Sequence, residues 1–234
     1  MGGGRARVIR VLGVAGAAGA VAGLAACGSG AQPRPVPNPA DAAMRVAQFD
    51  ELGGLMAWTP GGGIRVPDLV VYGDGTVVAG ARRTATLSPD AYADLVSTAR
   101  TGLKGLPQDP PSKLVITDGS SATLGVRFAD GTFGTVRVNN GFLGADTGYP
   151  GRLLTAYRAL KGLRLPETRP YTPASVVVGY GCSSTCSTTE TLNGSAAAVA
   201  RASCKPAYED PQQGGTRTCI WRYALPDELT SPAR

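Results

Sequence analysis

Short apolar runs separated by glycine-containing turns recur along the central part of the chain. The runs at residues 69–72 and 76–78 flank Asp74-Gly75, and those at residues 122–128 and 133–138 flank Asp130-Gly131. An Asp-Gly pair between two β-rich runs is typical of a β-hairpin. We expect further strands at residues 43–49, 113–117 and 174–180. The pattern therefore predicts an antiparallel sheet built of hairpins and a meander.

Two stretches show the spacing of an amphipathic helix. The first begins at Ser88-Pro89-Asp90, which supplies an N-cap, a first-turn proline and an early acid, and we expect Gly102 to end it. Its apolar face carries Tyr92, Leu95, Val96, Ala99 and Leu103. The second runs from about residue 150 to 161, with Leu153, Tyr157 and Leu160 on one face and Gly162 as its end. Hairpins interleaved with helices predict an α+β domain, with both helices on one face of the sheet.

The N-terminal 26 residues have the pattern of an export signal. Three arginines precede an uncharged run of 16 residues, which is short of the ~20 that a spanning helix needs. The run ends in Leu24-Ala25-Ala26-Cys27, which resembles the bacterial lipobox. This resemblance implies that the Cys27 thiol receives a diacylglyceryl group and that cleavage makes Cys27 the new N-terminus. Ordinary signal-peptide cleavage and an uncleaved anchor are the alternatives.

The mature chain is expected to begin with a tether. Residues 27–41 are rich in proline, glycine and serine, which favours an extended linker, and residues 42–234 then form a single domain. Loss of the three N-terminal arginines lowers the net charge from +6 to +3. The mature chain also has no basic run, so its charge pattern does not indicate a nucleic-acid partner. The expected partner is the membrane, reached through the lipid, and the expected location is its extracytoplasmic face.

Four cysteines remain after Cys27, namely Cys182, Cys186, Cys204 and Cys219. An even number of cysteines in an exported chain favours disulfides. A zinc site would require a short cysteine pair at both ends, and only the first pair is short. Three pairings are open, and we favour Cys182–Cys219 with Cys186–Cys204.

This nested pairing is preferred because of its flanks. Residues 176–180 and 221–225 have the composition of ordered strands, whereas the insertion at 181–220 is rich in small and polar residues. Such a segment buries little apolar surface, so we expect a crosslink to hold it. Closing a loop of about 37 residues would stabilise the fold by roughly 3–4 kcal/mol. The sequence thus predicts a C-terminal segment stapled by disulfides.

Three stretches together resemble a group of exported proteins of high-GC Gram-positive bacteria, whose function is uncharacterised. They are residues 67–75 (PDLVVYGDG), residues 171–176 (YTPASV), and Trp221 followed by Leu225-Pro226-Asp227. The cysteine-rich insertion departs from that group. The resemblance implies an envelope protein and supplies no activity.

Candidate chemistry is sparse. The chain has no histidine, which excludes Ser-His-Asp and Cys-His catalysis. Asp74, Asp118 and Asp130 each precede glycine and fit either paired catalytic carboxylates, calcium ligands or ordinary hairpin turns. The aromatic residues that could line a groove or else fill the core are Tyr149, Tyr157, Tyr171, Tyr180 and Trp221.

These observations predict a non-enzymatic binding or interaction module with no cofactor and no metal. The alternative function is that of a carboxylate-dependent hydrolase acting on cell-envelope material. That alternative requires two acids to converge some 5–10 Å apart.

Overall fold

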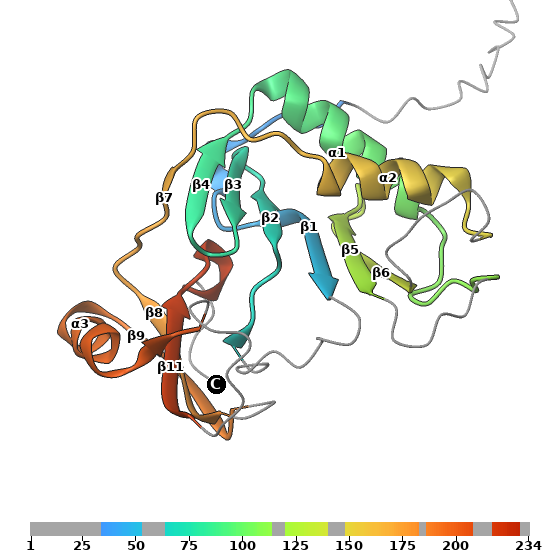
Figure 1. Cartoon of the computed structure of the whole chain (residues 1–234). Coiled ribbons are helices and arrows are strands. Elements are labelled where there is room, and N and C mark those ends of the chain that lie inside the picture. The colour runs from blue at the N-terminus through green and yellow to red at the C-terminus, as the bar shows by residue number, and fades with distance from the viewer. Residues whose placement is uncertain are drawn as a thin grey trace, which may run out of the picture. The chain divides into compact units, whose positions relative to one another are not determined.

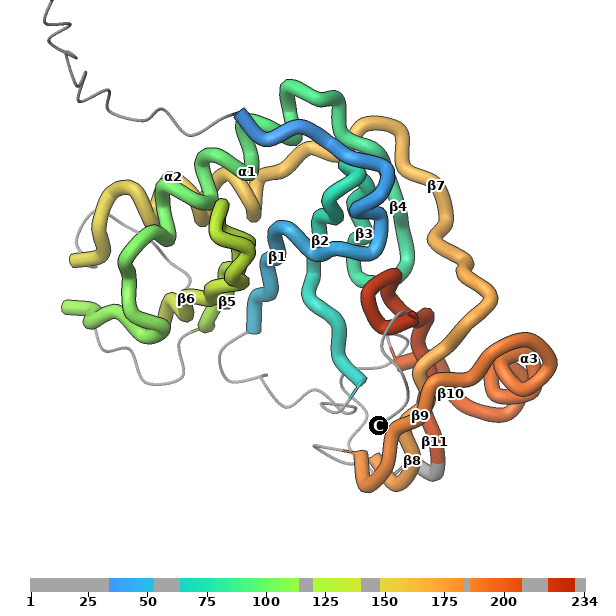
Figure 2. The backbone as a smooth tube through the Cα atoms, turned by 180° about the vertical axis from the view of Figure 1, so that it is seen from behind, coloured from blue at the N-terminus to red at the C-terminus, as the bar shows by residue number. Residues whose placement is uncertain are grey.

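The structure is a computed structural model, and it describes residues 34–52, 64–113, 120–139, 148–182, 186–207 and 217–229. The strand expected at residues 113–117 lies largely outside these ranges, as do Cys27 and the signal segment. The described part of the chain holds two sheets and three α-helices, and Figures 1 and 2 show how the backbone arranges these elements. No helix in these ranges is both long and apolar enough to cross a bilayer.

The first sheet has seven strands in the order β6-β5-β1-β2-β3-β4-β7, and every neighbouring pair is antiparallel. Its strands are β1 (Arg45–Leu52), β2 (Leu69–Tyr72), β3 (Thr76–Ala79), β4 (Arg83–Thr86), β5 (Ser121–Arg127), β6 (Phe133–Asn139) and β7 (Arg169–Pro170). The hairpins expected around Asp74 and Asp130 are both present. Strand β4 was not expected, because only one of its four side chains is buried.

Helices α1 (Pro89–Leu103) and α2 (Gly151–Lys161) pack on one face of this sheet (Figure 1). Ser88 caps α1 by accepting a hydrogen bond from the Ala91 N–H at 3.2 Å. Gly102 does not end α1, contrary to expectation. It lies inside the helix, where an added Cβ would overlap with Ala156 of α2 and come within 2.8 Å of the Arg152 carbonyl oxygen. Gly102 is therefore a close-contact residue between the helices.

The α+β fold class is confirmed.

A second sheet holds the C-terminal part, with the order β10-β11-β8-β9. Its strands are β8 (Val176–Cys182), β9 (Thr188–Leu192), β10 (Lys205–Pro206) and β11 (Arg217–Tyr223), and helix α3 (Gly194–Ser203) packs on it. The sequence did not predict the elements that the structure shows within residues 181–220. Ala197 and Ala200 of α3 are buried against Val176, Val178 and Trp221, so small side chains suffice to seat the helix.

The folded part begins earlier than residue 42. Residues 34–41, which the sequence assigned to the tether, lie against the first sheet and α1. The Asn38 N–H donates to the Gly73 carbonyl oxygen at 2.8 Å, and the short helix η1 (Pro39–Asp41) follows. The Arg34 guanidinium lies 3.0 Å from the carboxylate of Asp90. Specific hydrogen bonds thus override the linker-like composition of this segment.

Candidate functional site

The cysteines form two local disulfides, Cys182–Cys186 and Cys204–Cys219, and the expected nested pairing is wrong. Cys182 packs in the apolar cluster around Ile220, whereas Cys219 packs in the cluster beneath α3. The two cysteines therefore lie on opposite faces of the second sheet. Gly181, with a φ of 57°, precedes Cys182 and breaks the strand alternation that would have put them on one face.

Each disulfide closes a neighbouring pair of elements. Cys182–Cys186 joins the end of β8 to the residues just before β9, with Cα atoms 3.9 Å apart, and an added Cβ at Gly179 would overlap with its sulfur atoms. Cys204 follows α3 directly, and its bond to Cys219 on β11 fixes the end of that helix to the sheet, with Cα atoms 5.1 Å apart. The end of α3 and the start of β9 are thereby each crosslinked to a neighbouring strand of the second sheet.

The three stretches that carry the family resemblance meet where the second sheet joins the first. Tyr72 on β2 donates to Asp227 at 2.8 Å, and Arg45 on β1 pairs with the other oxygen of Asp227 at 2.8 Å. Burial and the neighbouring carboxylate of Asp227 raise the pKa of Tyr72, which keeps its hydroxyl a donor. Tyr171 donates to the Ala224 carbonyl oxygen at 2.7 Å. Residues from the three stretches that carry the resemblance thus connect the two sheets.

A second contact strengthens the same junction. Arg222 of β11 makes two hydrogen bonds to Glu228, at 2.6 and 2.7 Å, and its Nε donates to the Ile64 carbonyl oxygen. Glu228 also accepts from the Leu225 N–H at 2.7 Å. Burial raises the pKa of Glu228, but the hydrogen bonds and charge of Arg222 outweigh it, and the net pKa is lowered. The carboxylate therefore stays ionised and keeps the C-terminal residues folded onto β11.

The aspartates that the sequence offered as candidates act within their own turns. Asp74 accepts hydrogen bonds from the Thr76 N–H and hydroxyl, both at 2.9 Å, and Asp130 accepts from Thr132 at 2.9 and 2.7 Å. Their turns lie at the same end of the first sheet, separated by about three strand spacings, or ~14 Å. The structure does not bring these two carboxylates together, and Asp118 lies outside the described residues.

The sequence did not single out the acids at the end of β1. Glu51 accepts from the Tyr157 hydroxyl at 3.1 Å and from Lys161 Nζ at 2.9 Å, and Lys161 also lies 3.0 Å from the Tyr157 hydroxyl. The hydrogen bonds that Lys161 donates to Glu51 and Tyr157 raise its pKa. This trio fastens α2 to β1. The i, i+4 spacing of Tyr157 and Lys161 was the only signal available, because Glu51 is about 110 residues away.

Asp50, the neighbour of Glu51, belongs to a different environment. It pairs with Arg65 at 2.8 Å, and burial raises its pKa despite that charge. Successive side chains of a strand point to opposite faces, so Asp50 and Glu51 do not form a carboxylate pair. In the part of the chain that the structure describes, no three acids or cysteines lie together as metal ligands would.

The candidate aromatic residues lie mainly in the core. Tyr149, Tyr157 and Trp221 are all buried. Trp221 and Tyr223 meet edge to face with ring centroids 5.2 Å apart, and Tyr171 meets Tyr223 in the same way at 6.3 Å. These contacts favour packing over the alternative of an open aromatic groove.

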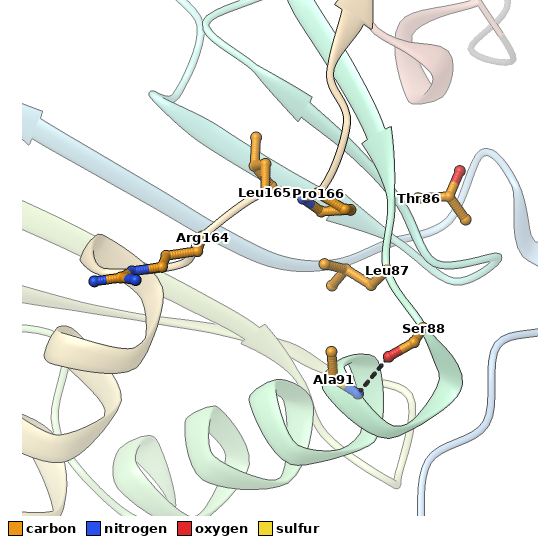
Figure 3. Close-up of a pocket in the computed structure, with 7 residues that line it drawn as sticks. All are labelled: Thr86, Leu87, Ser88, Ala91, Arg164, Leu165 and Pro166. Carbon is orange, nitrogen blue, oxygen red and sulfur yellow. Dashed lines mark hydrogen bonds between the residues drawn. The ribbon is translucent and has the colours of Figure 1, made fainter.

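A shallow hollow of about 580 Å³ lies beside the start of α1 (Figure 3). Its lining consists of Thr86, Leu87, Ser88, Ala91, Arg164, Leu165 and Pro166. The hydroxyl of Ser88 is engaged in capping the helix, and the Arg164 guanidinium points away from Leu87 in Figure 3. The hollow thus offers mainly apolar contact surface.

Comparison with protein-family models, curated proteins and solved structures gave no significant match. The lipobox and the resemblance to exported proteins therefore stay predictions. Functional conclusions rest on the residues of this chain alone.

Proposed function

We propose that the protein is an exported lipoprotein, anchored through Cys27 to the outer face of the cytoplasmic membrane, whose folded domain is a non-enzymatic binding module. The export signal and the Leu24-Ala25-Ala26-Cys27 motif support the anchor. The two disulfides support an oxidising location, because such bonds persist outside the reducing cytosol.

The observation that carries the binding function is the construction of the second sheet. Two disulfides and the Arg222–Glu228 pair hold it rigid, while its edge strand β9 leaves most of its side chains exposed. In the described ranges β9 pairs only with β8, so its outer edge has no strand partner. An exposed edge can accept an extended segment of another protein as an additional strand. We propose β9 as the surface that binds a partner protein of the envelope.

The anchor is tested by replacing Cys27 with Ala and separating membrane from soluble fractions. The wild-type chain should stay in the membrane fraction until detergent is added, and the Cys27→Ala variant should not be lipidated or cleaved at that site. A variant that carries the same lipid mass as the wild type would contradict the proposal.

The binding surface is tested by photo-crosslinking in intact cells. A crosslinker at Thr189 on β9 should give a discrete adduct, and one at Thr155, an exposed residue of α2, serves as the control. Adducts at Thr155 but not at Thr189 would contradict the choice of surface. The alternative hydrolase function gains no converging carboxylates from Asp74 and Asp130, and no specific observation favours it.

A further inference from the structure

Residues 34–38, the described part of the link between the proposed anchor and the domain, follow a defined path along the domain surface. Pro35 and Pro37 are half-buried, whereas Val36 between them is 71% exposed. Proline presets an extended backbone, so this segment loses little conformational freedom when it docks. From Asn38 onward the backbone is fixed by the hydrogen bond to Gly73.

Arg34 is the first described residue, and it is held by two acids of α1. Its Nη2 lies 3.0 Å from the Asp90 carboxylate and 3.1 Å from that of Asp94, one helical turn further on. All three side chains are largely exposed, so each contact contributes at most about 1 kcal/mol and is weakened by salt. The two ion pairs of Arg34, called the clasp below, can therefore open reversibly. The backbone hydrogen bond of Asn38 to Gly73 is the firmer attachment of this segment.

The clasp determines how far the domain can stand from an anchor at Cys27. Seven residue steps separate Cys27 from Arg34, and a fully extended chain covers at most ~25 Å over that distance. If the clasp opens, eleven steps to Asn38 allow about 40 Å. The ion pairs at Arg34 thus shorten the maximal reach by about 15 Å.

The clasp also selects which surface lies nearest the anchor. Asp90 and Asp94 flank Ala91, which lines the apolar hollow at the start of α1. The second sheet and α3 lie at the other end of the described part, as both views show (Figures 1 and 2). With Arg34 in place, its positive charge offsets one of the two negative charges of these acids. Without it, they would be repelled by anionic headgroups.

We propose that the surface around the start of α1, including the hollow, faces the phospholipid bilayer, and that Arg34 holds it there. This inference rests on the proposed lipid anchor. It places β9 and α3 on the side away from the membrane, where they are accessible to another protein.

The test uses the full lipidated chain in vesicles of phosphatidylcholine and phosphatidylglycerol that contain an acceptor-labelled lipid. A fluorescent amino acid is introduced either at Thr86, beside α1, or at Val199 on α3, which is 64% exposed. We expect stronger energy transfer from position 86 than from position 199. Arg34→Gln should lower transfer from position 86 by moving the domain outward by up to about 15 Å, and high salt should do the same. The control Arg158→Gln, on the exposed side of α2, should leave transfer unchanged.

The outcomes separate the two proposals. A chain that binds vesicles through its lipid but gives equal transfer from both positions would overturn the orientation alone. Unchanged transfer in Arg34→Gln would overturn the role of the clasp. A chain that carries no lipid and does not bind vesicles would overturn the proposed function, and the orientation with it.

Discussion

Removal of the Cys204–Cys219 disulfide should destabilise the domain by about 3 kcal/mol. This bond closes a loop with a sequence separation of 15, and the chain-entropy relation assigns about 3 kcal/mol to a loop of that length. The Cys182–Cys186 bond has a separation of only 4, for which the same relation gives about 2 kcal/mol. The longer bond also fixes the end of α3, so its loss should release that helix first.

The double variant Cys204→Ala/Cys219→Ala tests this in urea denaturation, with Cys182→Ala/Cys186→Ala as the matched control. With a denaturant slope of about 2 kcal/mol/M, the midpoint should fall by roughly 1.5 M in the first variant. In the control, the loss of the constraint on the shorter loop should lower the urea midpoint by roughly 1 M. Because Cys182 is fully buried, its replacement also removes packed atoms, so the control gives an upper limit for the effect of its loop.

A single replacement gives the result that decides the pairing. In Cys219→Ala the structure leaves Cys204 as the free thiol, whereas the nested pairing would leave Cys182 free. Alkylation without reductant followed by peptide mapping identifies the labelled cysteine. A label on Cys182 would show that Cys219 pairs with Cys182 and that the two cysteines do not lie on opposite faces of the second sheet.

Other perturbations act on packing and charge. Gly102→Ala should lower the free energy of unfolding by about 1–3 kcal/mol in thermal unfolding, because the added Cβ overlaps with α2. In the control Gly151→Ala, the added Cβ has nothing within 4 Å, so stability should change by less than about 0.5 kcal/mol. Similar values for the two variants would contradict the close contact between the helices. Glu228→Gln should lower the free energy of unfolding by about 2–3 kcal/mol, because it leaves the charge of Arg222, whose side chain is only 8% exposed, without its partner. The 29% exposure of the Glu228 side chain keeps the loss from being larger. Chemical denaturation measures it, with the exposed Glu190→Gln as the control. Because the pKa of Glu228 is lowered on folding, the ionised carboxylate stabilises the fold above about pH 4.5, and this stabilisation is lost as the pH falls through the pKa of the folded state. Hydrogen exchange at residues 217–229 of the wild type should then accelerate. Unchanged protection would contradict the role of this carboxylate.

The two hairpins of the first sheet and its two helices could be predicted because their signals are local. Asp-Gly turns with flanking β-rich runs, and the Ser88-Pro89 cap, each act within a few residues. Strand β4 and helix α3 lack such signals. Strand β4 buries only one of its four side chains. Helix α3 packs through alanines, whose burial depends on Val176 and Trp221 elsewhere in the chain.

The sites were harder to predict than the fold. The disulfide pairing depends on Gly181, whose positive φ moves Cys182 to the face of the sheet opposite Cys219. Composition could not reveal this. The trio at the end of β1 joins Glu51 to Tyr157 and Lys161, which lie about 110 residues further along the chain, a relation that no sequence spacing records. The docked position of Arg34 likewise depends on acids about 60 residues away.

An intact mass of the protein, extracted from membranes without reductant, shows whether the domain is lipid-anchored and held by disulfides. We expect a chain that begins at Cys27, heavier by a diacylglyceryl group and lighter by the four hydrogens that two disulfides remove. An unlipidated chain recovered from the medium, or one with free thiols at these cysteines, would contradict it.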